Sequence, residues 1–180
     1  QASRISAVRD IRSTLTELDK IGARAEYASV DVRDATAVAD VLNNVRTRSG
    51  PITGILHGAG VVEDRYLADK TDDNFSAVFD TKVLGLKALL EATDGDPLNS
   101  LFLFSSVSAR FGNAGQSDYA MANEVLGEVA AMVAVARPEC TVRSIDWGPW
   151  DGGMVTPGLR EHFLAKGAAL VPIDTGSRAL

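Results

Sequence analysis

Four side chains have the types and spacing expected for proton transfer to a carbonyl oxygen: Lys82, Ser106, Tyr119 and Asn123. Tyr119 and Asn123 are four residues apart in a predicted helix, so their side chains share one face. Ser106 directly follows a predicted strand, and Lys82 belongs to an earlier helix. Reduction of a ketone needs an acid for the developing alkoxide and groups that hold the carbonyl. The four residues together can supply both.

Tyr119 is the predicted acid, provided that its pKa falls from the usual value of about 10. A neighbouring ammonium group favours the phenolate, so the sequence predicts that Lys82 lowers the pKa of Tyr119 toward neutrality. Ser106 would then donate to the substrate oxygen, while Asn123 orders the proton relay. Each residue alone has a structural explanation, such as a helix-capping serine or a solvated lysine. Their joint spacing favours catalysis.

Strands and helices must alternate to place these residues at one site. Hydrophobic periodicity and Gly or Pro boundaries predict helices over residues 11–21, 35–48, 71–92 and 118–136. Short apolar runs predict strands over residues 25–32, 52–56, 101–104 and 141–147. The alternation indicates a doubly wound α/β fold with a parallel sheet, in which ligands bind beyond the carboxyl ends of the strands.

Composition excludes several classes of function. The 18 basic and 24 acidic residues give a formal charge of −6, without the basic cluster that nucleic acid requires. The apolar runs are shorter than the roughly 20 residues of a membrane span, and no secretory signal is visible. The single Cys140 cannot form an intramolecular disulfide and suits a protein core in the cytoplasm. No residue is assigned to a metal.

The active-site segment resembles that of the short-chain dehydrogenase/reductase superfamily. The resemblance rests on Leu103-Phe104-Ser105-Ser106, on Gly112 and Gly115, and on Tyr119-Ala120-Met121-Ala122-Asn123. Most members of that superfamily have Tyr-x-x-x-Lys, with Asn on the preceding helix. Here Asn and Lys are exchanged, as in ketoreductase domains of type I polyketide synthases. The exchange is physically tolerable because the two positions face each other across adjacent helices.

The resemblance extends from about Ala23 to Trp150 and implies a Rossmann-like fold with a nicotinamide cofactor, NADPH. It implies that Asp31 and Val32 border the adenine, that Gly58, Ala59 and Gly60 after His57 back the ribose, and that Gly148 and Pro149 flank the nicotinamide. Lys82 and Tyr119 would also contact the cofactor. Glycines allow such close backbone approach, although a short glycine pattern alone also fits a plain turn.

The resemblance also bears on stereochemistry. Family members that produce a D-configured β-hydroxyl tend to carry Leu-Asp-Asp eighteen residues before the lysine, where this sequence has Val62-Glu63-Asp64. Phe111 replaces the Trp that is associated with the opposite outcome. Asp64 and Phe111 are therefore the predicted stereocontrol residues, and the hypothesis is a D-hydroxyl product. The alternative is that Asp64 is an ordinary solvated carboxylate.

The resemblance further implies that the 180 residues form a partial catalytic domain, beginning just before the third strand of the family's sheet. The first two strands, with their phosphate-binding loop, and the last strand are expected from flanking sequence or from another chain. Strands left without these neighbours would have exposed edges, so the chain should not fold stably alone. Residues 151–166, with Gly152 and Gly153 as a hinge, are either a lid or an ordinary surface helix.

Three functions follow from these observations. The leading one is reduction of a β-ketoacyl chain on an acyl carrier protein, within a larger synthase of the polyketide or polyunsaturated fatty acid type. A free-standing 3-oxoacyl reductase is the second, which the exchanged Asn and Lys argue against. The third is an inactive structural module, and the persistence of all four catalytic residues argues against it.

Overall fold

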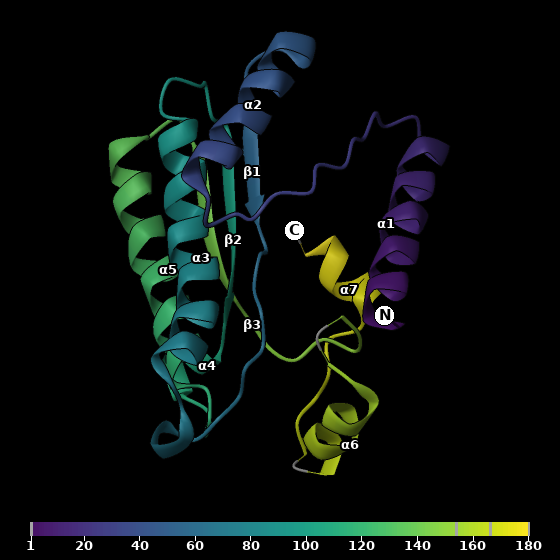
Figure 1. Cartoon of the computed structure of the whole chain (residues 1–180), viewed down its shortest axis with the longest axis vertical. Coiled ribbons are helices and arrows are strands. Elements are labelled where there is room, and N and C mark those ends of the chain that lie inside the picture. The colour runs from purple at the N-terminus through teal and green to yellow at the C-terminus, as the bar shows by residue number, and fades with distance from the viewer. Residues whose placement is uncertain (1, 154, 166, 180) are drawn as a thin grey trace. The chain divides into compact units, whose positions relative to one another are not determined.

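The structure is a computed structural model that describes residues 2–153, 155–165 and 167–179. It divides into two compact units, Gln1–Asp31 and Val32–Leu180. Figure 1 labels their helices and strands in chain order. The first unit contains α1 (Ala2–Lys20). Gly22 follows it with a φ of 76°, and the amide of Ala23 donates to the carbonyl of Leu18, so the predicted glycine stop is confirmed.

The strand predicted over residues 25–32 is wrong. These residues form neither helix nor strand, and most of them are exposed. A β-strand is defined by backbone hydrogen bonds to a neighbour, and the described sheet pairs only β1, β2 and β3. The described sheet offers residues 25–32 no neighbouring strand, and a local sequence pattern alone cannot make an extended segment part of a sheet.

The second unit has a three-stranded parallel sheet in the order β1-β2-β3. Its strands are β1 (Gly54–His57), β2 (Ser100–Ser106) and β3 (Thr141–Trp147). Three longer helices connect or precede them, namely α2 (Ala35–Ser49), α3 (Asp72–Ala92) and α5 (Ser117–Ala136). The strands pair in continuous register, with Ile55 beside Leu101 and Leu103 beside Ser144. The predicted α/β Rossmann-like class is confirmed.

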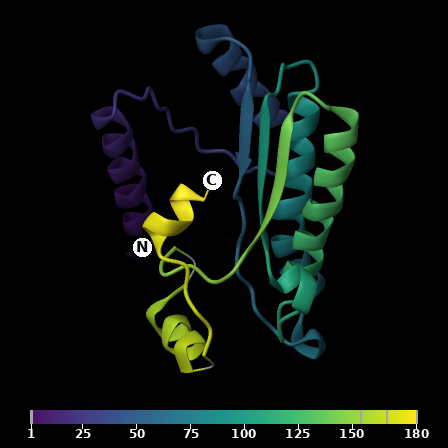
Figure 2. The same ribbon diagram turned by 180° about the vertical axis from the view of Figure 1, so that it is seen from behind.

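The core lies between one face of the sheet and two helices, α3 and α5, which pack side by side (Figures 1 and 2). Alternate strand residues point into it, so Leu101 and Leu103 are fully buried against Leu86 of α3 and Leu126 of α5. The opposite face is more open, and Leu56 of β1 is 55% exposed there.

Four short elements complete the described structure: η1 (Leu67–Asp69), α4 (Ser108–Phe111), α6 (Pro157–Ala165) and α7 (Ile173–Arg178). The sequence pattern predicted a helix only for α6, because the other three are too short to show periodicity. An isolated parallel bridge between Trp150 and Val171 joins the segment after β3 to the segment before α7. It thereby closes the loop that contains α6 and leads into α7.

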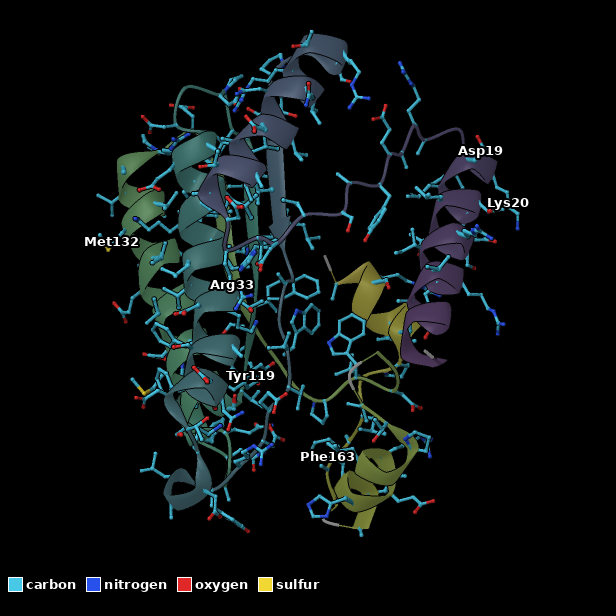
Figure 3. The ribbon with its side chains drawn as sticks, in the orientation of Figure 1. Asp19, Lys20, Arg33, Tyr119, Met132 and Phe163 are labelled. Atoms are coloured by element: carbon cyan, nitrogen blue, oxygen red, sulfur yellow. The ribbon has the colours of Figure 1, made fainter. Side chains whose placement is uncertain are left out.

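Helix α5 is long and apolar enough to cross a bilayer by length and composition alone. It packs on α3, β2 and β3, and it buries the polar side chains of Asp118 and Asn123. Apolar side chains such as Met132, 70% exposed, lie on its outer side (Figure 3). The buried polar groups are those of a core helix.

Candidate active site

The three strands end at a cavity of about 610 Å³. Ser106 ends β2, Trp147 ends β3, and Gly58 follows β1 directly, so each strand contributes to the wall. Lys82 and Tyr119 reach the same cavity from α3 and α5. Parallel α/β sheets bind ligands at this end of the strands. Three of the four predicted catalytic residues therefore share one cavity wall.

Asn123 lies behind that wall, one helical turn after Tyr119. Its side chain is fully buried, and its Nδ2 donates to the carbonyl of Tyr119 at 2.8 Å. The hydroxyl of Ser105 donates to the carbonyl of Asn123 at 3.1 Å, which ties this turn of α5 to β2. Within the described residues, the Oδ1 atom of Asn123 has no hydrogen-bond partner. Asn123 thus brings a free, buried acceptor next to the tyrosine.

Lys82 is positioned by a helix with a well-defined start. Thr71 and Asn74 form a capping box at the beginning of α3, and Lys82 lies three turns later. Its side chain is 3% exposed, and its Nζ donates to the carbonyl of Phe104 at 2.8 Å and lies 5.4 Å from the centre of the Tyr119 ring. Burial lowers the pKa of Lys82 to about 8. The ammonium therefore persists at neutral pH.

Gly60 leaves space for this lysine. A Cβ atom at Gly60 would lie 3.4 Å from Cε of Lys82, which is a tight contact.

Ser106 is oriented by its own helix-start neighbour, because its Oγ accepts a hydrogen bond from the amide of Ser108 at 3.2 Å. The amide occupies an acceptor position, so the Ser106 hydroxyl proton is available for a ligand.

The pKa of Tyr119 moves in the direction opposite to the prediction. Burial raises the pKa above its usual value, the Asp64 carboxylate adds to this, and hydrogen bonding with Asn123 and Ser106 acts in the other direction. The prediction relied on the Lys82 ammonium, which lies over the ring and is held by the Phe104 carbonyl. Desolvation of the phenolate outweighs the two hydrogen bonds that favour it. Tyr119 is consequently a fully protonated acid at neutral pH.

The predicted cofactor residues fall into different environments. Gly58, Gly60, Gly148 and Pro149 line the cavity. His57 is 2% exposed and donates from Nε2 to the carbonyl of Lys82 at 2.9 Å, and burial lowers its pKa to about 4. Its neutral imidazole therefore fastens β1 to α3.

Three further predicted cofactor residues, Ala59, Val32 and Asp31, are not among the cavity-lining residues. Ala59 lies between the two lining glycines. Val32 begins the second unit and packs beside Gly85 of α3, where an added Cβ would lie 2.9 Å from Cγ2 of Val32. Asp31 ends the first unit. The cofactor roles of these residues stay predictions.

Both predicted stereocontrol residues lie on the cavity wall. Asp64 accepts a hydrogen bond from Nε2 of Gln116 at 2.9 Å, so its carboxylate has a fixed partner. Phe111, the last residue of α4, is 86% exposed and lines the cavity as well. Gln116 itself was not predicted, because no local pattern links it to a residue 52 positions earlier.

The segment after β3 closes another side of the cavity. Val155, together with Leu159 and Phe163 of α6, lines it, and Figure 3 shows Phe163 on α6 and Tyr119 at the start of α5. Gly152 and Gly153 precede them with φ values of 151° and 63°, which favour glycine. This arrangement suits the predicted lid, whose movement stays a prediction.

Sequence reasoning missed a buried ion pair beside the tyrosine. Nζ of Lys70 lies 2.6 Å from Oδ2 of Asp118, and both side chains are 2% exposed. The two residues are far apart in sequence, and a lysine before a helix gives no signal of burial. Among the described residues, no three His, Cys, Asp or Glu side chains are grouped to hold a metal ion.

Comparison with known proteins gives a consistent result. The chain is 40% identical over 174 residues to a polyunsaturated fatty acid synthase of Thraustochytrium sp., covering 96% of this chain and 6% of that protein. It is 37% identical over 179 residues to polyketide synthase PksN of Bacillus subtilis, covering 95% and 3%. The chain therefore spans less than a tenth of the length of these relatives.

Solved structures match the fold closely. An N-terminal ketoreductase from the macrolactin assembly line has a TM-score of 0.84 at 30% identity, over 95% of this chain and 34% of that one. A ketoreductase domain from the bacillaene assembly line has a TM-score of 0.82 at 35% identity, over 94% and 42%. The KR domain family model matches residues 2–152. The chain, with Lys82, Ser106 and Tyr119 on one cavity, belongs to the KR domain family, the ketoreductases of the short-chain dehydrogenase/reductase superfamily.

Proposed function

We propose that this chain carries the catalytic residues for NADPH-dependent reduction of a β-ketoacyl thioester to a β-hydroxyacyl thioester. The observation that supports this most directly is the convergence of Lys82, Ser106 and Tyr119 on one cavity, with Asn123 buried behind them. A carbonyl in this cavity would meet hydroxyl groups from two elements. The reaction class, ketone reduction, agrees with the KR family.

The residues present fit the reactive end of a nicotinamide cofactor. Gly58, Gly60, Gly148 and Pro149 form cavity wall without bulky side chains, and Gly60 leaves room for the end of the Lys82 side chain. Lys82 donates one hydrogen bond within the described residues, to Phe104, so its remaining N–H groups are available to ribose hydroxyls. A bound reduced nicotinamide would supply the hydride. NADPH rather than NADH is inferred from the family resemblance.

Ser106 and Tyr119 have separate tasks in this proposal. Ser106 donates its hydroxyl proton in a hydrogen bond to the carbonyl oxygen, where negative charge develops. Tyr119 transfers its phenolic proton to that oxygen and becomes a phenolate, which the nearby Lys82 ammonium stabilises. The raised pKa of Tyr119 keeps the proton on the acid until the alkoxide forms. Asn123 would order the relay: its free Oδ1 would accept a hydrogen bond from a water molecule that passes a proton from solvent to the phenolate.

The proposed substrate is a β-ketoacyl chain on the phosphopantetheine arm of an acyl carrier protein, delivered within a cytoplasmic synthase. Two observations support this: the relatives are named as polyketide and polyunsaturated fatty acid synthases, and Lys and Asn are exchanged relative to most of the superfamily. Apolar side chains of the lid segment, Leu159 and Phe163, suit an acyl chain. We further propose a D-configured product, because Asp64 is retained on the cavity wall.

The test is substrate-dependent NADPH oxidation by the full-length polypeptide with a β-ketoacyl thioester. Tyr119→Phe should lower kcat by at least roughly a hundredfold, since it removes the proton donor and keeps the ring. Tyr27→Phe is the matched control, because Tyr27 is 58% exposed in the first unit, and it should leave the rate unchanged.

Other results would change the proposal. A wild-type protein without NADPH oxidation, together with a silent Tyr119→Phe substitution, would show an inactive structural module. Equal turnover of free and carrier-bound thioesters would favour a reductase that acts without a synthase. Chiral analysis that finds mainly the L-alcohol would contradict the stereochemical assignment.

A further inference from the structure

A buried ion pair lies at the start of α5, outside the four residues that perform the proposed chemistry. Lys70 precedes α3, and Asp118 is the second residue of α5. Their side chains are 2% exposed and 2.6 Å apart. Burying two charges is unfavourable unless their geometry is good and further hydrogen bonds satisfy them. An apolar pair of similar size would often stabilise the fold more, so this pair calls for another explanation.

Each partner of the pair holds a second group. Nζ of Lys70 also donates to the carbonyl of Glu63 at 3.0 Å. Oδ1 of Asp118 accepts from the amide of Tyr119 at 2.9 Å. The chain Glu63–Lys70–Asp118–Tyr119 is therefore continuous. It connects the residue before Asp64 to the backbone of the proposed acid.

Two more hydrogen bonds join the same two segments. The amide of Arg65 donates to the carbonyl of Gly115 at 3.0 Å, and Gln116 donates to Asp64 at 2.9 Å. Gly115 has a φ of 83°, and a Cβ there would lie 3.6 Å from the Arg65 backbone. Residues 63–65 and 115–119 are thus joined by these hydrogen bonds and by the Lys70–Asp118 ion pair, which is the buried part of the set. We call this set of contacts the clamp.

Both clamped segments reach the cavity, through Asp64 on one side and through Tyr119 on the other. A shift of either segment would change the distance and angle between the acid and the opposite wall. Well-oriented reacting groups are worth several orders of magnitude in rate, and a misplacement of about 1 Å can lower the rate about a hundredfold. Stereochemical outcome depends on the same geometry, because it is decided by which face of the carbonyl is turned toward the hydride donor while the oxygen lies at the acid.

We propose that Lys70 and Asp118 are positioning residues that set Tyr119 and the Asp64 segment at a fixed separation across the cavity. The proposal rests on the proposed reductase function and deepens it. The ion pair acts through the amide of Tyr119 and the carbonyl of Glu63, so neither residue touches the substrate. Two charged, hydrogen-bonded partners fix a geometry more narrowly than an apolar contact does, which gives the buried charges a role beyond stability.

The experiment uses the full-length polypeptide with Lys70→Met and Asp118→Asn. Each variant is expected to lower kcat at least about tenfold with a smaller change in KM, and to raise the share of the minor alcohol epimer. Lys87→Met is the matched control, because Lys87 pairs with Glu91 at 3.4 Å on the surface of α3, with both side chains more than half exposed. It should leave kcat and the epimer ratio unchanged.

A second measurement separates positioning from general loss of stability. The double variant Lys70→Met/Asp118→Leu removes both buried charges and should recover much of the thermal stability lost in the single variants. Positioning predicts that its kcat and epimer ratio remain altered. Recovery of stability, kcat and epimer ratio together would show that the pair only supports the fold, and unchanged single variants would also overturn the proposal.

Hydrogen–deuterium exchange makes the test independent of activity. In Lys70→Met, amides of residues 61–67 and 115–120 should exchange faster than in the wild type, while those of β3 stay unchanged. If the wild-type protein reduces no ketone, the proposed function fails, yet faster exchange still supports the clamp. Unchanged exchange in both segments would contradict the clamp even in an active enzyme.

Discussion

The buried ammonium of Lys82 lies beside the proposed acid, and its burial lowers the stability of the fold. The ammonium lies 5.4 Å from the centre of the Tyr119 ring, yet it is buried with a hydrogen bond to the Phe104 carbonyl. Burial lowers the pKa of Lys82 from 10.5 to about 8, which corresponds to ~3 kcal/mol. A basic group whose pKa is lowered in the native state destabilises that state at every pH below this pKa, where the group is charged in both the native and the unfolded chain.

Lys82→Met should therefore gain stability and lose activity. The free energy of unfolding at pH 7 should rise by up to ~3 kcal/mol, while kcat falls at least roughly a hundredfold. Native-state hydrogen exchange of α3 and NADPH oxidation measure the two effects. Lys87→Met, on the exposed surface of the same helix, should change neither. A variant that loses both stability and activity would assign Lys82 a mainly structural role.

The same pKa predicts an alkaline limit for the reaction. The ammonium form of Lys82 is present below a pH of about 8 and disappears above it, so kcat should fall as the pH rises through this value. Tyr119 does not set this limit, because its raised pKa keeps the phenol protonated over the same range. A pH–rate profile of the wild type that stays flat to a pH of about 10 would contradict a catalytic role for the charge.

The buried His57 should make the free energy of unfolding depend on pH below neutrality. Its pKa is about 4 in the native state and about 6.5 when unfolded, so the unfolded state binds more protons between these values. Stability should be complete above pH 6.5 and should fall by ~3 kcal/mol as the pH drops toward 4. His57→Gln should flatten this slope, whereas replacement of the exposed His162 by Gln should not. Denaturant unfolding at several pH values provides the measurement.

At the residue scale, sequence reasoning identified side chains better than their environments. The positions of Ser106, Tyr119 and Lys82 on one cavity followed from their elements. The direction of the Tyr119 pKa shift was not predicted correctly, because it depends on how deeply the phenol is buried. The Lys70–Asp118 ion pair was not predicted either, since no local sequence pattern indicates that two charges 48 residues apart meet in the core.

At the scale of elements, the three longer helices of the second unit were predicted to within one residue at each end. Helix α1 was predicted only over residues 11–21, yet it begins at Ala2, nine residues earlier. The helix predicted over residues 71–92 is α3, Asp72–Ala92, because Thr71 supplies a cap and Gly95 with Pro97 follows its end. The strand predicted over residues 25–32 failed, since strand formation depends on a partner rather than on local pattern. Short elements such as α7 were missed because one or two turns show no periodicity.

Gly176 allows helix α7 to pack closely against the ring of Trp150. A Cβ atom at Gly176 would overlap Cη2 of Trp150, so the tryptophan ring occupies the space of any larger side chain. Gly176→Ala should reduce the free energy of unfolding by about 1–3 kcal/mol and shift Trp150 at the cavity wall. Gly158→Ala in α6 is the matched control, because nothing lies within 4 Å of its Cβ position, and it should be neutral or slightly stabilising. Gly176→Ala with wild-type stability would contradict this packing.

At the scale of the whole molecule, the sheet is covered unevenly. Helices α3 and α5 bury one face, while Leu56 of β1 remains 55% exposed on the other. β1 also pairs with β2 alone among the described strands. An open strand edge beside an apolar face favours pairing with another chain.

The 180-residue chain expressed by itself should therefore associate as its concentration rises. Size-exclusion chromatography with light scattering should find species larger than a monomer, and thermal melting should be broad. Leu56→Lys should reduce the association, whereas Leu164→Lys, 48% exposed on α6, should not. A monomer with a sharp, cooperative transition would contradict this expectation.

The two tryptophans give the cavity an optical signature. The chain contains only Trp147 and Trp150, their rings are 4.7 Å apart in an edge contact, and both line the cavity. All tryptophan emission of this chain therefore originates at the wall where cofactor and substrate are proposed to bind. Nε1 of Trp147 is buried without a partner among the described residues, so its emission should respond to any ligand or water that reaches it. Fluorescence titration of this chain would follow binding without a label and without turnover.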